Sequence, residues 1–288
     1  MDNHYETIAF ETEGKILRLW LNRPDQHNAL NRRMVQELTT FFRNLEDVRD
    51  IRVVMLRGRG TSFCAGADLK WMQSSIHLSA ANNLQETREL SDMFEAVYKS
   101  RKIVIALAQG NIYGGGNGLL AACDLVYCTD NSGFSLSETR IGLVAATISP
   151  YLLHRISPAR LRELVLTARR FDGREAEASG LANRSFPTAE EMELYALRQA
   201  EAILGGGPQS ISTSKRLINQ LSDYRFPTGI HDMMAKILAE TRTSREAQEG
   251  MTAFLEKRKP DLTQKADKPD NTIETDAPAE ENSNSQPG

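Results

Sequence analysis

The 288-residue sequence lacks the features of membrane-spanning and secreted proteins. No apolar run approaches the roughly 20 residues that a membrane-spanning helix needs. The first residues also lack the basic and then apolar pattern of a secretory signal. The chain has three cysteines, an odd number in apolar surroundings, which is typical of reduced thiols in the cytosol. We therefore expect a cytoplasmic protein with no membrane partner.

Metal-ligand clusters and an excess of basic charge are missing as well. Cys123, Cys128 and the five scattered histidines show no recognisable metal-binding spacing, so no metal site is expected. The formal net charge is −3; residues 260–288 carry seven acids and two lysines, a net −5, which leaves +2 on the rest of the chain. The rest of the chain lacks the concentrated basic face that nucleic-acid binding requires, although it could still bind a small anion.

The last segment, residues 260–288, differs in composition from the rest. It contains almost no large apolar residues and many Asp, Glu, Asn, Pro and Ser residues. Such a segment cannot bury enough apolar surface to offset the entropy cost of ordering. We therefore predict a disordered acidic tail.

The stretch 103–124 shows the clearest pattern in the chain. Residues 103–108 are apolar and rich in β-branched side chains, which predicts a buried strand. Gly114, Gly115 and Gly116 follow and lead into a helix of small and apolar residues. Unpaired backbone N–H groups at such a turn suit a developing negative charge, and glycines allow close approach to the backbone. A tight strand-to-helix turn without a ligand explains the same residues, so this stretch alone leaves both interpretations open.

The rest of the chain predicts alternating strands and helices. Asn31 is the expected N-cap of a helix, as are Ser149 and Ser157, each of which precedes a proline. Thr188 with Glu191 forms a capping box for a helix ending near residue 204. The other predicted strands are 7–11, 16–21, 51–56 and 125–128, and the further helices are 210–221, 230–241 and 244–258.

Four motifs occur in an order and spacing that resemble a known family. They are Asn22-Arg23-Pro24 with residues 27–30, the small-residue loop 63–69, the glycines with residues up to Asp124, and Glu249-Gly250 with residues 253–258. Over roughly residues 5–260 the chain resembles the crotonase superfamily, the enoyl-CoA hydratase/isomerase family. The resemblance implies an α/β fold, a spiral of strand-strand-helix repeats with two sheets. Residues 1–200 would form the core, and residues 201–259 would form a helical region that assembles trimers or dimers of trimers.

The resemblance also implies an acyl-CoA site. The N–H groups of Ala67 and Gly115 would form an oxyanion hole for the thioester oxygen. CoA would enter as part of the substrate, so no separate cofactor is expected. The backbone around Ala65 would meet the adenine of CoA, and Lys257 of a neighbouring subunit would meet its phosphates. The other substrate-binding positions that the resemblance implies are Ala29, Gly66, Asp68, Leu69, Gly114 and Gly118.

The sequence departs from the best-known hydratases of this family at one catalytic position. Those hydratases use two glutamates, and here the first falls on Gly118 while Glu138 matches the second. Glu138 lies among apolar residues, so we expect a partly buried carboxyl with a raised pKa that both accepts and returns a proton. Asn117 is no proton acid and is expected to point elsewhere. Loss of the partner acid could cost up to about 10²–10⁴ in rate.

The segments 138–143 and 147–151, together with Gly118, narrow the resemblance. They are similar to bacterial single-glutamate hydratases that act on 3-methylglutaconyl-CoA, carboxygeranoyl-CoA and related carboxylated, branched esters in leucine or acyclic terpenoid breakdown. Gly118 would open room near the β-carbon for a branch. Arg140 and His154 are the nearest basic residues in sequence that could meet a substrate carboxylate, although an ion pair explains Arg140 better and a position on a helix surface explains His154 better.

Other functions remain open on the sequence alone. A double-bond isomerase needs only one base that moves a proton between two carbons, and Glu138 could serve. A decarboxylase and a non-catalytic acyl-CoA-binding protein are further alternatives. Serine hydrolysis and dinucleotide binding lack their motifs in this chain.

Overall fold

A computed structural model of the chain describes residues 5–75, 78–223, 245, 249, 253 and 256–261. The chain divides into two compact units, Met1–His231 and Asp232–Gly288. In the second unit Arg245, Glu249 and Ala253 are helical. Most of the predicted helices 230–241 and 244–258, and the predicted tail from residue 262 on, lie outside the described residues. The domain limits expected from the sequence stay a prediction.

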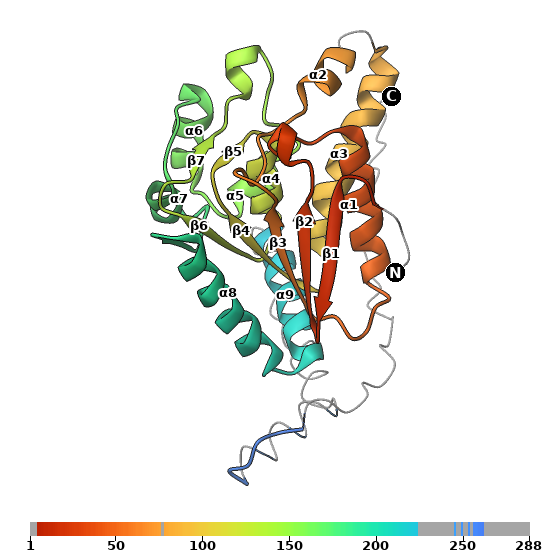
Figure 1. The fold of residues 1–288 in the computed structure, drawn as a ribbon, viewed down its shortest axis with the longest axis vertical. Helices are drawn as coiled ribbons and strands as arrows, with labels where there is room; N and C mark the ends of the chain where they lie inside the picture. Colours follow the sequence, from red (N-terminus) through yellow and green to blue (C-terminus); the bar gives the residue numbers. More distant parts are fainter. Residues whose placement is uncertain are drawn as a thin grey trace, which may run out of the picture. The chain divides into compact units, whose positions relative to one another are not determined.

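The first unit is built on a six-stranded sheet of order β1-β2-β3-β4-β6-β8 (Figure 1). β1 and β2 are antiparallel, and all further neighbours are parallel. The bounds are Ile8–Glu13 for β1, Ile16–Leu21 for β2, Val53–Gly58 for β3, Ile103–Ala108 for β4, Leu125–Thr129 for β6 and Arg184–Phe186 for β8.

Helices cover both faces of this sheet, and the strand sequences reflect it. Every residue of β4 is buried, because its alternate side chains enter two separate apolar clusters. Val104 and Ala106 belong to the larger cluster, and Ile103 and Ile105 belong to the smaller one with α8. Figure 1 shows α8 on the opposite side of the sheet from α1 and α3. No helix within the described ranges is long and apolar enough to cross a membrane.

The helices of the first unit vary widely in length. Their bounds are Arg32–Leu45 for α1, Leu69–Ser75 for α2, Ala80–Lys99 for α3, Gly115–Ala121 for α4, Ser149–Leu153 for α5, Pro158–Thr167 for α6, Gly173–Ser179 for α7, Ala189–Leu204 for α8 and Pro208–Asp223 for α9. Two 3-10 turns, η1 at Pro24–Gln26 and η2 at Glu138–Ile141, complete the set.

A second, two-stranded sheet pairs β5 (Asn111–Tyr113) in parallel with β7 (Gly133–Ser135). β5 leads directly into Gly114 and α4, and β7 leads into η2. The small sheet therefore brings the segment that carries Glu138 to the start of α4.

Helix caps follow the sequence in three of the four predicted cases. The side chains of Asn31, Ser157 and Thr188 accept hydrogen bonds from the third amide beyond each cap. The prediction for Ser149 is wrong, since α5 begins at Ser149 itself and its N-cap is Ile148. The Ser149 hydroxyl instead donates to the Ala145 carbonyl at 2.6 Å.

Arg155 fixes the residues that follow α4. Its guanidinium donates to the carbonyls of Ala121 at 3.2 Å and Asp124 at 2.9 Å, and also to that of Cys123. It further reaches the Leu181 carbonyl at 3.3 Å. One side chain thus satisfies several backbone acceptors where α4 ends and β6 begins.

We expect Arg155→Met to destabilise the protein, because each buried carbonyl left without a donor costs about 1–3 kcal/mol. Arg155→Lys, which keeps the charge and part of the bonding, should lose less. Denaturant titration of both variants measures the loss. Equal unfolding free energies for wild type and Arg155→Met would contradict this account.

Candidate active site

Two loops that leave the main sheet run side by side in a fixed register. Cys64 and Ile112 form a parallel bridge. The Cys64 N–H donates to the Asn111 carbonyl at 3.3 Å, and the Tyr113 N–H donates to the Cys64 carbonyl at 3.1 Å. Ala67 lies three residues beyond Cys64 and Gly115 lies three beyond Ile112, so the bridge holds the two loops that carry them side by side.

The first loop leaves the amide of Ala67 unused. Leu30 and Ala67 form a parallel β-bridge whose hydrogen bonds involve the residues on either side of Ala67. The Leu30 N–H donates to the Gly66 carbonyl at 2.7 Å, and the Asp68 N–H donates to the Leu30 carbonyl at 2.8 Å. The N–H of Ala67 itself donates to no acceptor in the described part of the chain, and Ala67 is exposed. It is therefore available to a ligand.

The second loop is a glycine turn with the same property at Gly115. Gly114 adopts φ 44° and ψ −117°, a conformation that L side chains rarely reach. Its N–H donates to the Ser135 carbonyl at 3.0 Å, which ties the turn to β7. Gly115 begins α4, and its N–H has no acceptor among the residues that the structure describes.

The two loops touch so closely that glycine is required at the contact. A Cβ on Gly66, whose φ is +93°, would lie 2.9 Å from the Tyr113 carbonyl oxygen. A Cβ on Gly116 would lie 2.5 Å from the Cys64 carbonyl oxygen. Cys64 is fully buried, and burial raises the pKa of its thiol to about 12. This close contact holds the amides of Ala67 and Gly115 on neighbouring segments.

Glu138 lies beside the glycine turn. Its Oε1 atom is 3.2 Å from the place where a Cβ on Gly114 would stand. Its Oε2 atom is buried and has no hydrogen-bond partner. Burial raises the pKa of this carboxyl, and the amide of Glu138 itself opposes the shift only in part. The structure thus places a half-buried acid with a raised pKa beside the turn that leads to the Gly115 amide.

Asn117 connects the parts of this site, a role that the sequence did not reveal. Its Nδ2 donates to the carbonyls of Ser135 at 2.8 Å and Ile112 at 3.2 Å. Ser135 therefore accepts from both Gly114 and Asn117. The side chain joins the end of β7, and with it the segment of Glu138, to α4.

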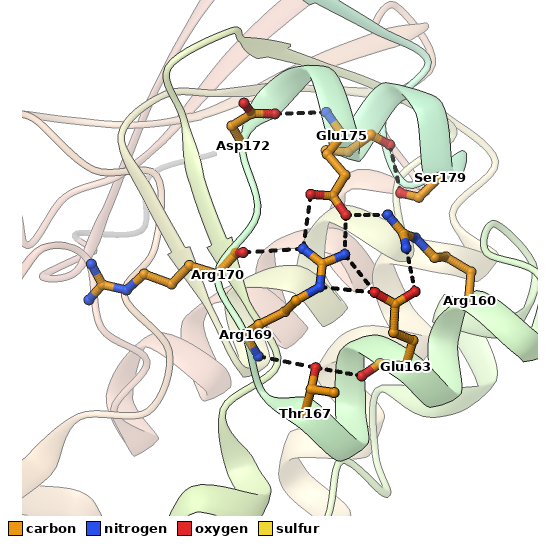
Figure 2. A network of polar contacts seen from close by, with 9 residues as sticks. Arg160, Glu163, Thr167, Arg169, Arg170, Asp172, Glu175 and Ser179 are labelled. Atoms are coloured by element: carbon orange, nitrogen blue, oxygen red, sulfur yellow. Dashed lines mark hydrogen bonds and ion pairs between the residues drawn. The ribbon is translucent and has the colours of Figure 1, made fainter.

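A salt-bridge cluster links α6 and α7 next to the segment that pairs with β7. Figure 2 shows the carboxylates of Glu163 and Glu175 facing the guanidinium groups of Arg160 and Arg169. Arg169 reaches Glu163 at 3.0 Å and Glu175 at 2.9 Å. The cluster holds α6 and α7 around residues 168–171. Phe171 in turn pairs with Phe134 of β7 through two backbone hydrogen bonds of 2.8 and 3.1 Å.

The expectation that Gly118 opens room for a branch is wrong. A Cβ on Gly118 would lie 2.1 Å from Cγ2 and 2.7 Å from Cβ of Ile148, and 3.2 Å from Cζ of Phe94. The space is filled by Ile148, so a side chain at position 118 could enter only if Ile148 moved. A Gly118→Glu variant would disturb this packing before it altered chemistry.

The remaining predicted residues fall into different environments. The Asp68 carboxylate forms an ion pair with Arg23 at 2.7 Å and accepts from the Lys70 N–H at 2.9 Å, so its side chain holds the loop. The Ala65 N–H donates to the His27 carbonyl at 3.0 Å. The Ala29 carbonyl accepts from the Arg23 guanidinium at 2.6 Å. Leu69 is 81% exposed at the start of α2.

The basic residues considered as partners for the substrate contact other groups or belong to the second unit. Arg140 donates to the Thr167 carbonyl at 3.0 Å. His154 stacks on Tyr98 with ring centroids 5.5 Å apart. Lys257 is exposed and belongs to the second unit. Its contact with CoA phosphates therefore stays a prediction.

We expect Asn117→Ala to lower both stability and any activity of the site. The change removes two buried hydrogen bonds, each of which typically contributes about 0.5–1.5 kcal/mol to stability. Thermal unfolding measures the first effect, and the substrate assay described below measures the second. As a control, Asn219→Ala removes a similar side chain-to-backbone bond from α9 to the Tyr98 carbonyl, and it should leave activity unchanged. Full activity in Asn117→Ala would contradict the connecting role.

Comparison with known proteins adds independent findings. A model of the family described as enoyl-CoA hydratase/isomerase matches residues 11–265. A protein of Thermus thermophilus, whose name gives enoyl-CoA hydratase as its expected activity, is 34% identical over 248 residues, which are 86% of this chain and 97% of that protein. The peroxisomal Delta(3,5)-Delta(2,4)-dienoyl-CoA isomerase of Arabidopsis thaliana is 31% identical over 265 residues, covering 88% of this chain and 95% of the relative.

The same fold occurs in solved structures. The crystal structure of an enoyl-CoA hydratase from Shewanella pealeana matches with a TM-score of 0.85 and 30% identity, over 89% of this chain and 96% of that chain. The mixed sheet with helices on both faces is thus the α/β fold that the sequence predicts.

Proposed function

Because the chain belongs to the enoyl-CoA hydratase/isomerase family, we propose that it adds water across the 2,3 double bond of an acyl-CoA thioester. The observation that carries the proposal is the position of Glu138, with one unpaired carboxyl oxygen, beside the turn that presents the Gly115 amide. CoA is part of the substrate, and the proposal includes no separate cofactor.

In this mechanism the amides of Ala67 and Gly115 bind the thioester oxygen. When a nucleophile attacks C3, negative charge moves onto that oxygen and an enolate forms. Two fixed donors stabilise this charge without having to reorient, and removal of one such donor typically costs about 10²–10³ in rate. The backbone contact between the loops keeps the donors in place.

Glu138 supplies the proton transfers. The ionised carboxylate accepts a proton from water as the water oxygen bonds to C3. The resulting carboxylic acid then gives the proton to C2, which converts the enolate into the saturated thioester. One water molecule is consumed, and Glu138 returns to its ionised form. A raised pKa suits this double role, because the group must both accept and release the proton near neutral pH.

The absent second carboxylate makes isomerisation the main alternative. Gly118 and Ile148 leave no acid where the best-known hydratases carry their first glutamate. A single base can move a proton between C2 and C4, and one relative of this chain is named an isomerase. A non-catalytic acyl-CoA-binding protein would keep the amides but show no turnover.

The finer proposal concerns the acyl group and the assembly. We infer a branched or carboxylated substrate such as 3-methylglutaconyl-CoA from the resemblance around Glu138 and Gly118, as in leucine breakdown. The carboxyl partner for such a substrate stays unassigned, because Arg140 and His154 contact other groups. A trimer or dimer of trimers, with Lys257 contributed by a neighbour, is proposed on the same resemblance.

A panel of enoyl-CoA esters tests the reaction. Loss of the conjugated thioester absorbance, with mass analysis of the product in ¹⁸O water, should show a 3-hydroxyacyl-CoA that carries the label. A migrated double bond without label would establish the isomerase instead. Tight binding without turnover on simple, branched and carboxylated esters would support the binding protein.

We expect Glu138→Gln to lose about 10²–10⁴ in rate and yet to be more stable than wild type at neutral pH. Burial raises the pKa of Glu138 in the folded protein. The stability that its protonation contributes is present below the ordinary carboxyl pKa and is lost as pH rises through the raised value. The unfolding free energies of the two proteins should therefore coincide below the ordinary carboxyl pKa. They should diverge as the pH rises from there through the raised pKa of Glu138. A variant less stable than wild type at neutral pH would argue against the buried, unpartnered carboxyl.

A further inference from the structure

One face of α4 is covered by apolar side chains that meet its glycines. At Gly118 an added Cβ would overlap Ile148 and touch Phe94, and at Gly115 it would lie 3.1 Å from Cδ1 of Leu30 and 3.9 Å from Cζ of Phe94. The same phenyl ring thus reaches both glycines. Because residues three apart lie on one face of a helix, Leu30, Phe94 and Ile148 form a continuous apolar surface beside the Gly115 amide.

This surface lies deeper than the groups proposed to act on the substrate. Ala67 is exposed, and Gly115 and Glu138 are half-buried. Ile148 is 2% exposed and Phe94 is fully buried. Glu138 adjoins Gly114, whereas Ile148 adjoins Gly118, four residues or about 6 Å further along the helix axis. A substrate held by the two amides would therefore have Glu138 at one side of C2 and C3, and Ile148 below the group that C3 carries.

We propose that Ile148 is a specificity-determining residue that forms the floor of the acyl site and limits the size of the group on C3. Ile148 occupies the place of the side chain that residue 118 lacks. The inference rests on the proposed acyl-CoA site, and it assigns to that site an apolar floor beside Gly118. The acyl group then meets a methyl group where a second carboxylate would otherwise stand.

The expected effect follows from the size of the change. Ile148→Ala removes three carbon atoms from the floor. One methylene in a hydrophobic pocket changes the kcat/KM ratio of two substrates by about 10–200-fold. We expect the ratio of kcat/KM for 2-hexenoyl-CoA to that for crotonyl-CoA to rise at least about tenfold in Ile148→Ala, with a smaller rise in Ile148→Val.

A matched variant separates specificity from general loss of packing. Ile156 is also isoleucine, is 1% exposed and belongs to the same apolar cluster. Ile156→Ala should lose comparable stability but keep the wild-type substrate ratio. If Ile148→Ala folds poorly, Ile148→Val carries the test, because Ile→Val removes a single methyl group. An unchanged ratio in the folded Ile148 variants, or an equal change in Ile156→Ala, would overturn the proposal.

A binding measurement keeps this inference distinct from the proposed reaction. Calorimetric affinities for hexanoyl-CoA and butyryl-CoA require no turnover. If wild type turns over no ester but the affinity ratio shifts in Ile148→Ala and not in Ile156→Ala, the floor is established and hydration is rejected. If wild type turns over crotonyl-CoA and neither ratio shifts, hydration stands and the role of Ile148 is rejected.

Discussion

Two hydrogen bonds between Cys64 and its neighbours Asn111 and Tyr113 join the loops that follow β3 and β4. The pairing holds the loop that carries Ala67 beside the segment that leads to Gly115. The same closeness leaves no space for a Cβ at Gly66 or Gly116. Glycine at these two positions is thus a requirement of the backbone contact.

The surroundings of two carboxyl groups, those of Asp68 and Glu138, shift their pKa values in opposite directions. Burial alone would raise the pKa of Asp68, but Arg23 and the amides of Trp71 and Lys70 outweigh it and hold this pKa below its usual range. At Glu138 only the residue's own amide opposes burial among the described residues, so burial dominates and raises its pKa. Asp68 is therefore a permanent anion that fixes the first loop, and Glu138 is the acid able to exchange a proton. Environments that push two pKa values apart in this way assign different roles to chemically similar groups.

Much of the fold could be predicted from local sequence, because local chemistry determines it. The apolar run of β4 signals a strand buried on both faces, and the caps at Asn31 and Thr188 mark helix starts. The glycine turn could be recognised from its own residues, whereas Ala67, Gly115 and Glu138 are assigned as site residues through the resemblance to the family. Ile148 in the space of Gly118, and the bond from Asn117 to Ser135, could not, because each joins segments whose approach depends on the pairing of β5 with β7. Ser149 is not the N-cap for a local reason, because α5 begins at Ser149 itself and its hydroxyl donates to the Ala145 carbonyl four residues earlier.

The burial of Cys64 has a consequence for how the first loop can be observed. A thiol with a pKa of about 12 carries almost no thiolate at neutral pH, and this one has no solvent contact. Alkylating reagents and peroxide can reach it only when the backbone around the bridge to Ile112 opens. The rate at which this sulfur reacts would therefore measure how often the two loops come apart.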